Sequence, residues 1–341
     1  MPNPPPIEIL VTIPFTDAQL DNLRNLSPRI RVTSQPARRP EDISAEVWER
    51  TEVLYTDRIL PDPALVPNLR WLQFHFAGVD FALDSPLLRK PDLQVTTLSG
   101  AAAPQMAEYA LSMMLVLGHQ LPALSLNQTR AEWPRDRWDR FSPRELRGST
   151  VGLIGYGSIG REIARLLHPW NCTVLAVKRD VMHPQDLDYI PPGMGDPDGE
   201  YFTRLYPVQA VCSVMKECDF VVVSLPLTPQ TRGLIGEPEL AVMKSTAYLI
   251  HIGRGGVVAE SALLDALQNK RLAGAVLDVF GEEPLPPTSP FWRLPNALVT
   301  PHVGGISRFY ADRAMDMLME NLQRYLSGGV LLNRFDLERG Y

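Results

Sequence analysis

One stretch of the sequence, from Val151 to Arg179, limits most strongly the folds that this chain can adopt. It reads VGLIGYGSIGREIARLLHPWNCTVLAVKR, in which apolar runs over 151–154 and 173–177 flank a glycine-rich turn and a segment with apolar residues at helical spacing. These periodicities predict a strand, a helix and a second strand. Within such a βαβ unit, the GxGxxG pattern is typical of dinucleotide binding.

The three glycines of this turn each have a separate physical role. Gly155 permits the tight turn, Gly157 lets the backbone approach a pyrophosphate, and Gly160 lets the helix pack close to the strand. The helix directs unpaired N–H groups and the positive end of its dipole at the phosphates. A tight turn without a ligand is the alternative. The predicted cofactor contacts here are Gly155, Tyr156, Gly157, Ser158, Ile159 and Gly160.

The residues after the second strand indicate which dinucleotide binds. An acidic side chain about 20 residues after the turn usually holds a free ribose 2′-hydroxyl. Here Lys178 and Arg179 stand 18 and 19 residues after Gly160, and Asp180 follows them. Two cations suit a 2′-phosphate, which an arginine binds through its planar fork of donors. We therefore predict that NADP(H) is preferred and NAD(H) possible; solvated charges at a strand end are the alternative.

Strands alternate with helices along most of the chain, which indicates an α/β fold. Thr16, with Gln19 three residues later, is a capping-box pattern that predicts the start of a helix. We expect two Rossmann-like domains, each a doubly wound parallel sheet, with a cleft between them. The predicted strands cover 7–13, 31–33, 52–55, 71–74, 151–154, 173–177, 220–224, 247–252, 273–278 and 297–300.

Composition limits the class of protein. The net charge is −6, and no basic run is dense enough to indicate nucleic-acid binding. The first residues, MPNPPP, lack the pattern of a signal peptide, and no apolar stretch is long enough to cross a bilayer. Cys172, Cys212 and Cys218 form no CxxC pair, which favours reduced thiols over a disulfide frame or metal site. We expect a cytoplasmic protein without a metal, nucleic-acid or membrane partner.

Three segments stand outside the regular alternation. The stretch 105–121 is apolar on almost every face, so we expect a helix buried all round, in the core or against another subunit. The stretch 130–147 is polar and irregular, and its Trp133 and Trp138 suit an arm that wraps a partner subunit. The stretch 181–207, rich in Pro, Gly and Asp, is predicted to be a surface loop near the adenosine end of the cofactor.

Candidate catalytic residues follow three predicted strands of the second half. Arg254 stands between glycines, two acids, Glu282 and Glu283, follow the next strand, and His302 follows the last. In a parallel sheet these strand ends converge on the crevice that the glycine turn faces. Each residue alone fits a solvated strand end equally well. Their combination after a dinucleotide unit favours catalysis.

An arginine, a carboxylate and a histidine beside a nicotinamide suit the reduction of a 2-keto acid. Arg254 can hold the substrate carboxylate and polarise the neighbouring carbonyl. His302 can donate the proton that the new alkoxide needs. A carboxylate next to the histidine favours its protonated form. On spacing alone, either Glu282 or Glu283 can supply that carboxylate.

The sequence resembles the D-isomer-specific 2-hydroxyacid dehydrogenase family, which includes glyoxylate/hydroxypyruvate reductases and phosphoglycerate dehydrogenases. The resemblance spans nearly the whole chain in the family's order, and it is more specific to the family than to a substrate. The matching pieces are AGVD at 77–80, AEYAL at 107–111, VGLIGYGSIG at 151–160, PLTPQTRGLI at 226–235, GRGGVV at 253–258, LDVFGEEPL at 277–285, TPHVGG at 300–305 and the closing LNRFDLERGY.

The resemblance implies roles for individual residues. Arg254, Glu283 and His302 would form the catalytic set, with Glu283 rather than Glu282 next to the histidine. The backbone of Ala77, Gly78 and Val79 would bind the substrate together with Arg254 and His302. Further cofactor contacts would be Leu225, Pro226, Thr231, Ile252, Gly253, Asp278, His302 and Gly304.

The resemblance also implies the domain organisation. The substrate-binding domain would be discontinuous and consist of 1–98 plus 305–341, and the dinucleotide-binding domain would be 99–304. Closure of the cleft would exclude water before hydride transfer. Family members are usually homodimers through the dinucleotide-binding domain, which would explain the apolar 105–121 helix.

The sequence departs from the family pattern at several positions. Lys178 stands where NAD-preferring members have an acid, Tyr109 replaces a common histidine, and His251 and Gly253 replace a common asparagine and serine. Glu283 disfavours a formate dehydrogenase, because that family replaces the glutamate beside the histidine. A non-catalytic dinucleotide-sensing protein, like the corepressors that resemble this family, is the other alternative, since those keep the catalytic residues. We expect a small or medium 2-keto acid as the substrate.

Overall fold

The computed structural model describes residues 5–341, and the chain divides into two compact units. Unit 1 comprises the described residues up to Ala102, the short segment Leu187–Pro191, and Ser307–Tyr341. Unit 2 comprises Ala103–Asp186 and Pro192–Ile306. The unit borders lie within a few residues of the expected domain borders, but the sequence-based division places 187–191 in the other domain.

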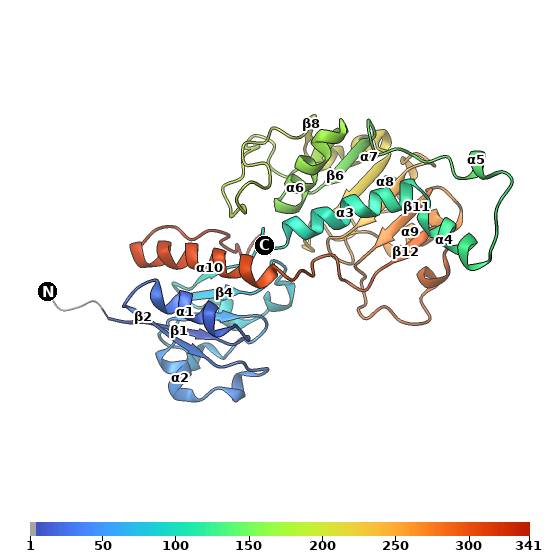
Figure 1. Ribbon diagram of the computed structural model, residues 1–341. Coiled ribbons are helices and arrows are strands. Elements are labelled where there is room, and N and C mark those ends of the chain that lie inside the picture. Colours follow the sequence, from blue (N-terminus) through green and yellow to red (C-terminus); the bar gives the residue numbers. More distant parts are fainter. Residues whose placement is uncertain (1–4) are drawn as a thin grey trace. The chain divides into compact units, whose positions relative to one another are not determined.

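Unit 1 is built on a five-stranded, wholly parallel sheet in the order β2-β1-β3-β4-β5 (Figure 1). Its strand order reverses at β1, as in doubly wound folds. Helices α1 and α10 cover one face, and α2 covers the other. The elements are β1 (Ile7–Val11), α1 (Asp17–Asn25), β2 (Ile30–Ser34), η1 (Pro40–Asp42), α2 (Ala45–Arg50), β3 (Val53–Thr56), η2 (Pro63–Leu65), β4 (Trp71–Phe74), η3 (Asp80–Ala82), η4 (Pro86–Arg89), β5 (Gln94–Thr96) and α10 (Tyr310–Ser327), where η marks a 3₁₀ helix.

Helix α1 begins where the capping-box pattern predicts. The Thr16 hydroxyl accepts a hydrogen bond from the Gln19 N–H at 3.3 Å, and the Gln19 side chain accepts one from the Thr16 N–H at 3.0 Å. These bonds satisfy donors that a helix start otherwise leaves unpaired. Leu20 and Leu23 then bury their side chains in the core beside β1. The predicted helix start is confirmed.

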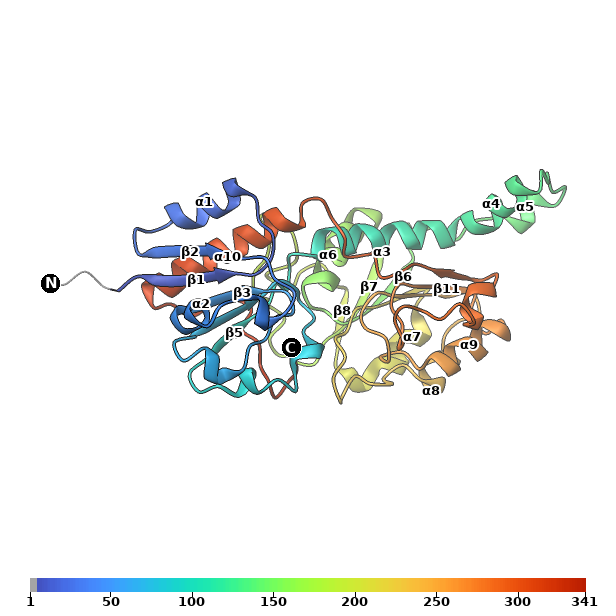
Figure 2. The same ribbon diagram turned by 90° about the horizontal axis from the view of Figure 1, so that it is seen from below.

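Unit 2 contains a seven-stranded, wholly parallel sheet in the order β12-β11-β10-β9-β6-β7-β8. Helices α3 and α6 lie on one face, and α7, α8 and α9 lie on the other (Figure 2). Because both faces are covered, a central strand such as β9 is buried and apolar at every position. The two parallel sheets confirm the predicted fold class. The elements are α3 (Ala103–Gly118), α4 (Leu121–Thr129), α5 (Arg137–Arg140), β6 (Thr150–Ile154), α6 (Ser158–Leu167), η5 (His168–Trp170), β7 (Thr173–Val177), β8 (Arg204–Tyr206), η6 (Val208–Ala210), α7 (Val211–Glu217), β9 (Phe220–Val223), α8 (Glu237–Ala241), β10 (Tyr248–His251), α9 (Glu260–Gln268), β11 (Gly274–Leu277), η7 (Pro290–Arg293) and β12 (Ala297–Val299).

Helix α3 is only partly buried within the chain, so its apolar sequence is not explained by burial in the core alone, and burial against another subunit stays a prediction. Ala107, Ala110 and Met114 are buried, whereas Leu111 and Met113 are partly exposed. The helix packs against α6 and the sheet on one side. Its other apolar side therefore lacks complete cover within the described residues.

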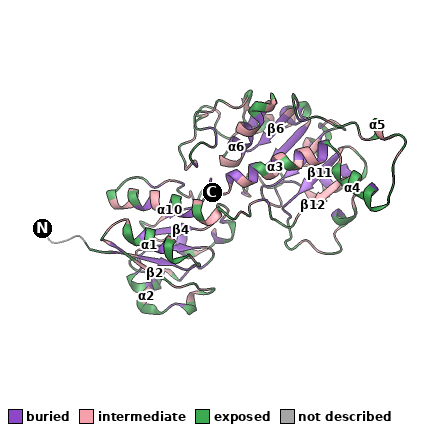
Figure 3. Ribbon diagram, viewed as in Figure 1, coloured by how far each residue is buried: buried purple, intermediate pink, exposed green. Residues whose placement is uncertain are grey.

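Helices α4 and α5 extend away from the seven-stranded sheet at the end of α3 (Figure 2). Figure 3 shows that burial is concentrated on the strands, while this extension has much exposed surface. Trp133 and Trp138 are 82% and 77% exposed. Among the described residues, no single helix is long and apolar enough to span a membrane; only α3 and α4 taken together, bent by 61°, meet that test.

The prediction of a surface loop over 181–207 is only partly correct. Arg204–Tyr206 forms β8, the edge strand that pairs with β7. The segment Leu187–Pro191 belongs to unit 1, where Tyr189 packs against a small apolar cluster that includes Leu98 and Ala101. The N–H of Tyr189 donates to the Asn333 side chain at 3.0 Å. The segment therefore contributes to both units.

The rest of this segment is attached to helix α6 through Arg161, whose side chain is 1% exposed. Its guanidinium donates to the carbonyl oxygens of Asp196 and Pro184, both at 2.5 Å, and forms an ion pair with Asp186 at 3.1 Å. The Asp196 carboxylate accepts a hydrogen bond from the Tyr156 hydroxyl at 2.5 Å. The buried guanidinium thus connects the segment to the helix that begins in the glycine turn.

Replacing the buried arginine tests this attachment. Arg161→Met is expected to lower the free energy of unfolding by about 3–5 kcal/mol, because it leaves buried carbonyl groups and the Asp186 carboxylate without their donor. Urea unfolding followed by circular dichroism measures the change. The control Arg24→Met removes an exposed ion pair with Asp21 and is expected to change the same quantity by less than about 1 kcal/mol. Equally small effects of both substitutions would refute the structural role of Arg161.

Candidate active site

The glycine turn lies at the point where the strand order of unit 2 reverses, between β6 and β9. Open α/β sheets bind their ligands beside such a point. The Ser224 hydroxyl, after β9, donates to the Gly155 carbonyl oxygen at 3.3 Å. A Cβ on Gly155 would lie 3.1 Å from the Leu225 side chain. Gly155 and Leu225, two of the predicted cofactor-binding residues, therefore lie next to each other.

Helix α6 begins inside the glycine turn, as the dinucleotide pattern predicts. Gly157 caps the helix and is exposed, and apart from Gly157 and its chain neighbours no described residue has an atom within 4 Å of the position that its Cβ would take. A phosphate can therefore approach the backbone N–H groups of the helix start. A Cβ on Gly160 would overlap the Gly155 carbonyl oxygen, so only glycine lets the helix pack on the turn.

The other residues of the turn differ in what they present. Ser158 and Ile159 are partly exposed. Tyr156 is 2% exposed, and its hydroxyl donates to the Asp196 carboxylate. Tyr156 thus presents its backbone, and not its ring, beside the helix start.

The end of β7 carries the predicted 2′-phosphate contacts. The Lys178 ammonium donates to the carbonyl oxygens of His183 at 2.5 Å and Gln185 at 3.3 Å, so it also holds the first part of the 181–207 segment. Arg179 is exposed. The Asp180 carboxylate lies 2.7 Å from the His183 ring, whose hydrogen bond lowers the pKa of Asp180. The acid at this strand end is therefore engaged with a histidine.

Two other predicted cofactor segments pack against each other beside the turn. A Cβ on Gly253, after β10, would lie 2.5 Å from the Leu225 carbonyl oxygen, so the two loops are in close contact. The Thr231 hydroxyl donates to the Pro226 carbonyl oxygen at 2.6 Å, which fixes the loop after β9. Ile252 is buried. Unit 2 thus brings these five predicted contacts together.

Arg254 lies in a turn that is pressed against the loop after β11. A Cβ on Gly255 would overlap the Phe280 carbonyl oxygen, so the close approach of the two loops requires glycine there. The Arg254 side chain is partly exposed, and its guanidinium donates to the Gly253 carbonyl oxygen at 2.9 Å. The loop contact places this arginine beside the segment that carries Glu283.

Glu283 and His302 form a hydrogen-bonded pair. Nδ1 of His302 lies 2.7 Å from Oε2 of Glu283, and Oε1 accepts a hydrogen bond from the Phe280 N–H at 2.9 Å. Burial raises the pKa of Glu283, but the hydrogen bonds from His302 and Phe280 and the charges of His302 and Arg254 outweigh burial and lower it. Glu283 is therefore ionised at neutral pH. Since Nδ1 is engaged, Nε2 is the ring nitrogen available for a substrate.

Asp278 holds the loop that carries His302. Its buried carboxylate accepts hydrogen bonds from the Thr300 hydroxyl at 2.6 Å and from the N–H groups of Val303 and Gly304 at 2.9 Å each. Between them, His302 has a φ of +52°, a left-handed conformation that costs free energy unless its surroundings hold it. The three hydrogen bonds to Asp278 provide that support.

The predicted substrate contacts of unit 1 follow β4. Ala77 is exposed, Gly78 is partly exposed and Val79 is buried. His75, just before them, has Nδ1 at 2.7 Å from the Tyr55 hydroxyl. Burial lowers the pKa of His75 to about 4, so the neutral ring accepts that hydrogen bond. His75 is therefore a packed residue next to the three predicted contacts.

The sequence of unit 2 matches a known protein family. Residues 111–304, more than half of the chain, match the family model of the D-isomer specific 2-hydroxyacid dehydrogenase, NAD binding domain. The chain belongs to this family. A relative, the glyoxylate reductase of Thermofilum pendens, is 31% identical over 280 residues, which are 81% of this chain and 77% of that protein.

Two solved structures resemble this 2-hydroxyacid dehydrogenase over nearly its full length. One is a D-isomer specific 2-hydroxyacid dehydrogenase from Xanthobacter autotrophicus Py2 in complex with NADPH and MES, with a TM-score of 0.79 and 28% identity over 99% of this chain and 100% of that one. The other is an NADPH-dependent glyoxylate/hydroxypyruvate reductase from Sinorhizobium meliloti in complex with NADP and sulfate, with a TM-score of 0.76 and 28% identity over 98% and 100%. The chain is therefore an oxidoreductase that acts on 2-hydroxy acids with a nicotinamide dinucleotide.

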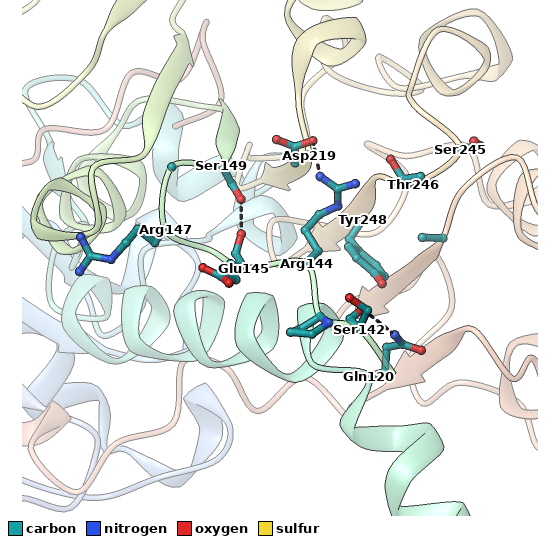
Figure 4. Close-up of a pocket in the computed structure, with 13 residues that line it drawn as sticks. Gln120, Ser142, Arg144, Glu145, Arg147, Ser149, Asp219, Ser245, Thr246 and Tyr248 are labelled. Carbon is teal, nitrogen blue, oxygen red and sulfur yellow. Dashed lines mark hydrogen bonds and ion pairs between the residues drawn. The ribbon is translucent and has the colours of Figure 1, made fainter. Parts of the chain in front are cut away.

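A polar pocket of this dehydrogenase lies at the opposite edge of the seven-stranded sheet (Figure 4). Its volume is about 710 Å³, and its lining includes Ser149, Asp219 and Tyr248, which lie at the amino ends of strands. Arg144 donates to the Asp219 carboxylate there at 3.0 Å. Because the glycine turn follows the carboxyl end of β6, this pocket is separate from the candidate catalytic residues.

Sequence reasoning missed the contact between Tyr109 and Thr300. The two hydroxyl oxygens lie 2.6 Å apart, although 191 positions separate the residues. Both residues stand within sequence pieces that resemble the family, AEYAL and TPHVGG, so a signal for their importance was present. No spacing rule indicates that a helix at 103–118 touches a loop at 300–304.

Alanine substitutions at two glycines separate ligand approach from helix packing. Gly157→Ala has room for the methyl group and is expected to fold normally but to bind NADPH about tenfold more weakly or worse, because the methyl group occupies the path of the pyrophosphate. Gly160→Ala is expected to destabilise the protein by about 1–3 kcal/mol, because its methyl group overlaps the Gly155 carbonyl oxygen. Thermal unfolding and NADPH fluorescence titration measure both effects. A folded Gly157→Ala protein with undiminished NADPH affinity would contradict this site.

Proposed function

We propose that this chain reduces a small or medium 2-keto acid to the D-2-hydroxy acid with NADPH. The observation that carries the proposal is the His302–Glu283 pair, 2.7 Å apart and within reach of the Arg254 charge, at the sheet edge of the glycine turn. Glyoxylate and hydroxypyruvate are the first candidates, since relatives from Thermofilum pendens and Sinorhizobium meliloti are named for them.

In this proposal Arg254 binds the substrate. Its guanidinium pairs with the substrate carboxylate and polarises the adjacent carbonyl. The backbone of Ala77, Gly78 and Val79 binds the same carboxylate. The open Gly157 and the start of α6 fit a dinucleotide pyrophosphate. When bound, the cofactor supplies the hydride that reaches the carbonyl carbon.

His302 supplies the proton. Its Nε2–H donates to the carbonyl oxygen as that oxygen gains negative charge, which leaves a neutral ring with its Nδ1–H on Glu283. The lowered pKa of Glu283 keeps its carboxylate ionised, so that it orients the ring and offsets the imidazolium charge before transfer. In the reverse direction the neutral ring takes the hydroxyl proton as hydride leaves C2.

Turnover with a panel of keto acids tests the proposal. Loss of NADPH absorbance is followed with glyoxylate, hydroxypyruvate, pyruvate, ketoisocaproate and phenylpyruvate, and we expect turnover of at least one of the smaller acids. Arg254→Ala is expected to lower kcat/KM by about 10²–10³-fold, and His302→Gln to lower kcat by about 10²–10⁴-fold. The control Arg293→Ala, at an exposed arginine of unit 2, should change neither value.

Other outcomes of that experiment favour other functions. Tight NADPH binding without turnover of any acid would reject the reductase and favour a dinucleotide-sensing protein. Oxidation of formate with NADP⁺ would favour a formate dehydrogenase, which the glutamate beside His302 argues against.

We infer that NADPH is preferred to NADH. Support comes from Lys178 and the exposed Arg179 at the end of β7, and from the two similar structures that hold NADPH or NADP. Asp180, the acid nearest to these cations in the sequence, is engaged with His183. A guanidinium binds a 2′-phosphate through two parallel hydrogen bonds.

Removal of one cation tests this preference. Arg179→Gln is expected to weaken NADPH binding by about tenfold or more and to leave NADH binding unchanged, because only NADPH carries the 2′-phosphate. Fluorescence titration measures both dissociation constants. Arg147→Gln, at the opposite sheet edge, is the matched control. Similar affinities for both cofactors in the unaltered protein would overturn the inference.

We also propose a homodimer through unit 2. The partly exposed side of α3 continues into α4, where Leu121, Leu124 and Leu126 are 46%, 38% and 46% exposed. A second copy of the chain would cover this apolar surface together with Trp133 and Trp138. Sedimentation velocity at micromolar concentration is expected to show a dimer, and the double variant Trp133→Ala/Trp138→Ala a shift toward the monomer. A monomeric unaltered protein would refute the dimer.

A further inference from the structure

The first turns of α3 are bonded to the loop that carries His302. The Gln105 side chain donates to the Gly305 carbonyl oxygen at 2.6 Å. The position that a Cβ on Gly304 would take lies 3.3 Å from atoms of both Met106 and Tyr109. Helix α3 begins at the unit border after Ala102, and the loop ends near the border after Ile306. Two of the four places where the chain passes from one unit to the other are thus joined on the unit 2 side.

The Tyr109 hydroxyl adds a directed hydrogen bond to this contact. The Thr300 hydroxyl donates to the Asp278 carboxylate at 2.6 Å, so the Thr300 oxygen has lone pairs to accept from Tyr109, also at 2.6 Å. Burial raises the pKa of Tyr109 to about 12, which keeps the phenol protonated as a donor at neutral pH. The order of donation is therefore Tyr109 to Thr300 to Asp278.

The carboxylate at the end of this relay is the one that holds His302. Asp278 also accepts the N–H groups of Val303 and Gly304, on the far side of a histidine with φ of +52°. The hydrogen bond from Tyr109 orients the Thr300 hydroxyl toward Asp278. Oδ1 of Asp278 then accepts from Thr300 and from the Val303 N–H, and Oδ2 accepts from the Gly304 N–H. Asp278 thus holds the loop on both sides of the left-handed histidine, at Thr300 before it and at Val303 and Gly304 after it.

We propose that Tyr109 is a positioning residue for His302, acting through Thr300 and Asp278. The proposal rests on the proposed function, in which His302 Nε2 delivers the proton. Tyr109 does not touch the reacting atoms; its hydroxyl keeps the His302 loop in the geometry that lets Nδ1 stay on Glu283 and Nε2 face the substrate. It also connects that geometry to the helix that begins at the unit border.

Tyr109→Phe removes only the hydroxyl and keeps the ring packed against Gly304. It is expected to lower kcat by about 10- to 100-fold, because a small displacement of the proton donor slows transfer. The dissociation constant for NADPH and the unfolding temperature are expected to stay unchanged. Tyr248→Phe, at a partly buried tyrosine on the opposite sheet edge, is the matched control and should leave kcat unchanged.

A double-mutant cycle tests the relay itself. Thr300→Val is expected to lower kcat as Tyr109→Phe does, and the combined variant to show no further loss, because both substitutions break one chain of hydrogen bonds. If the loss of kcat in the combined variant equalled the product of the two single losses, the two residues would act independently. An unchanged kcat in Tyr109→Phe, or a loss of stability alone, would overturn the positioning role.

A spectroscopic measurement separates this inference from the proposed function. The Nδ1–H proton of His302, identified in ¹⁵N-histidine-labelled protein by its absence in His302→Gln, reports the bond to Glu283. In Tyr109→Phe this signal is expected to broaden or move upfield, whether or not any keto acid is turned over. An unaltered signal in Tyr109→Phe would reject the positioning role, whereas absent turnover with a shifted signal would reject only the reductase.

Discussion

Every group of unit 2 assigned to the site depends on one constraint: all strands of the seven-stranded sheet run in the same direction. Parallel strands place the loops after β6, β9, β10, β11 and β12 at one edge of the sheet. Gly155, Arg254, Glu283 and His302, far apart in sequence, share that edge for this reason. The return connections need helices on both faces, which bury the strands and explain why β9 is apolar at every position.

At that edge, hydrogen bonds and charge hold the loops that carry Glu283 and His302. A buried carboxylate costs free energy unless donors surround it, and Asp278 meets this requirement by accepting three hydrogen bonds from the His302 loop. The same hydrogen bonds therefore satisfy the buried Asp278 carboxylate and hold His302 in its left-handed conformation. Glu283 behaves similarly, since the Phe280 N–H and the His302 ring fix both of its oxygens.

Local rules in the sequence predict what depends on neighbouring residues. The βαβ unit and the Thr16 capping box follow from spacing and side-chain chemistry within a few positions, and both are present. Contacts made by single residues leave no such signal. Tyr189 lies in a segment without periodicity, yet it packs in unit 1. Arg161 has the sequence context of an exposed helix residue, yet the segment that contains Tyr189 buries it. For α3, an apolar sequence indicates that cover is needed but not which surface provides it.

A crystal structure with NADP⁺ and oxalate, an analogue of a 2-keto acid that is not reduced, would show directly whether this sheet edge binds cofactor and substrate. We expect the pyrophosphate beside Gly157, an oxalate carboxylate paired with Arg254, and an oxalate oxygen about 2.6–3.2 Å from Nε2 of His302. Oxalate bound away from His302, or a dinucleotide that does not contact the glycine turn, would contradict the assignment of this sheet edge as the active site.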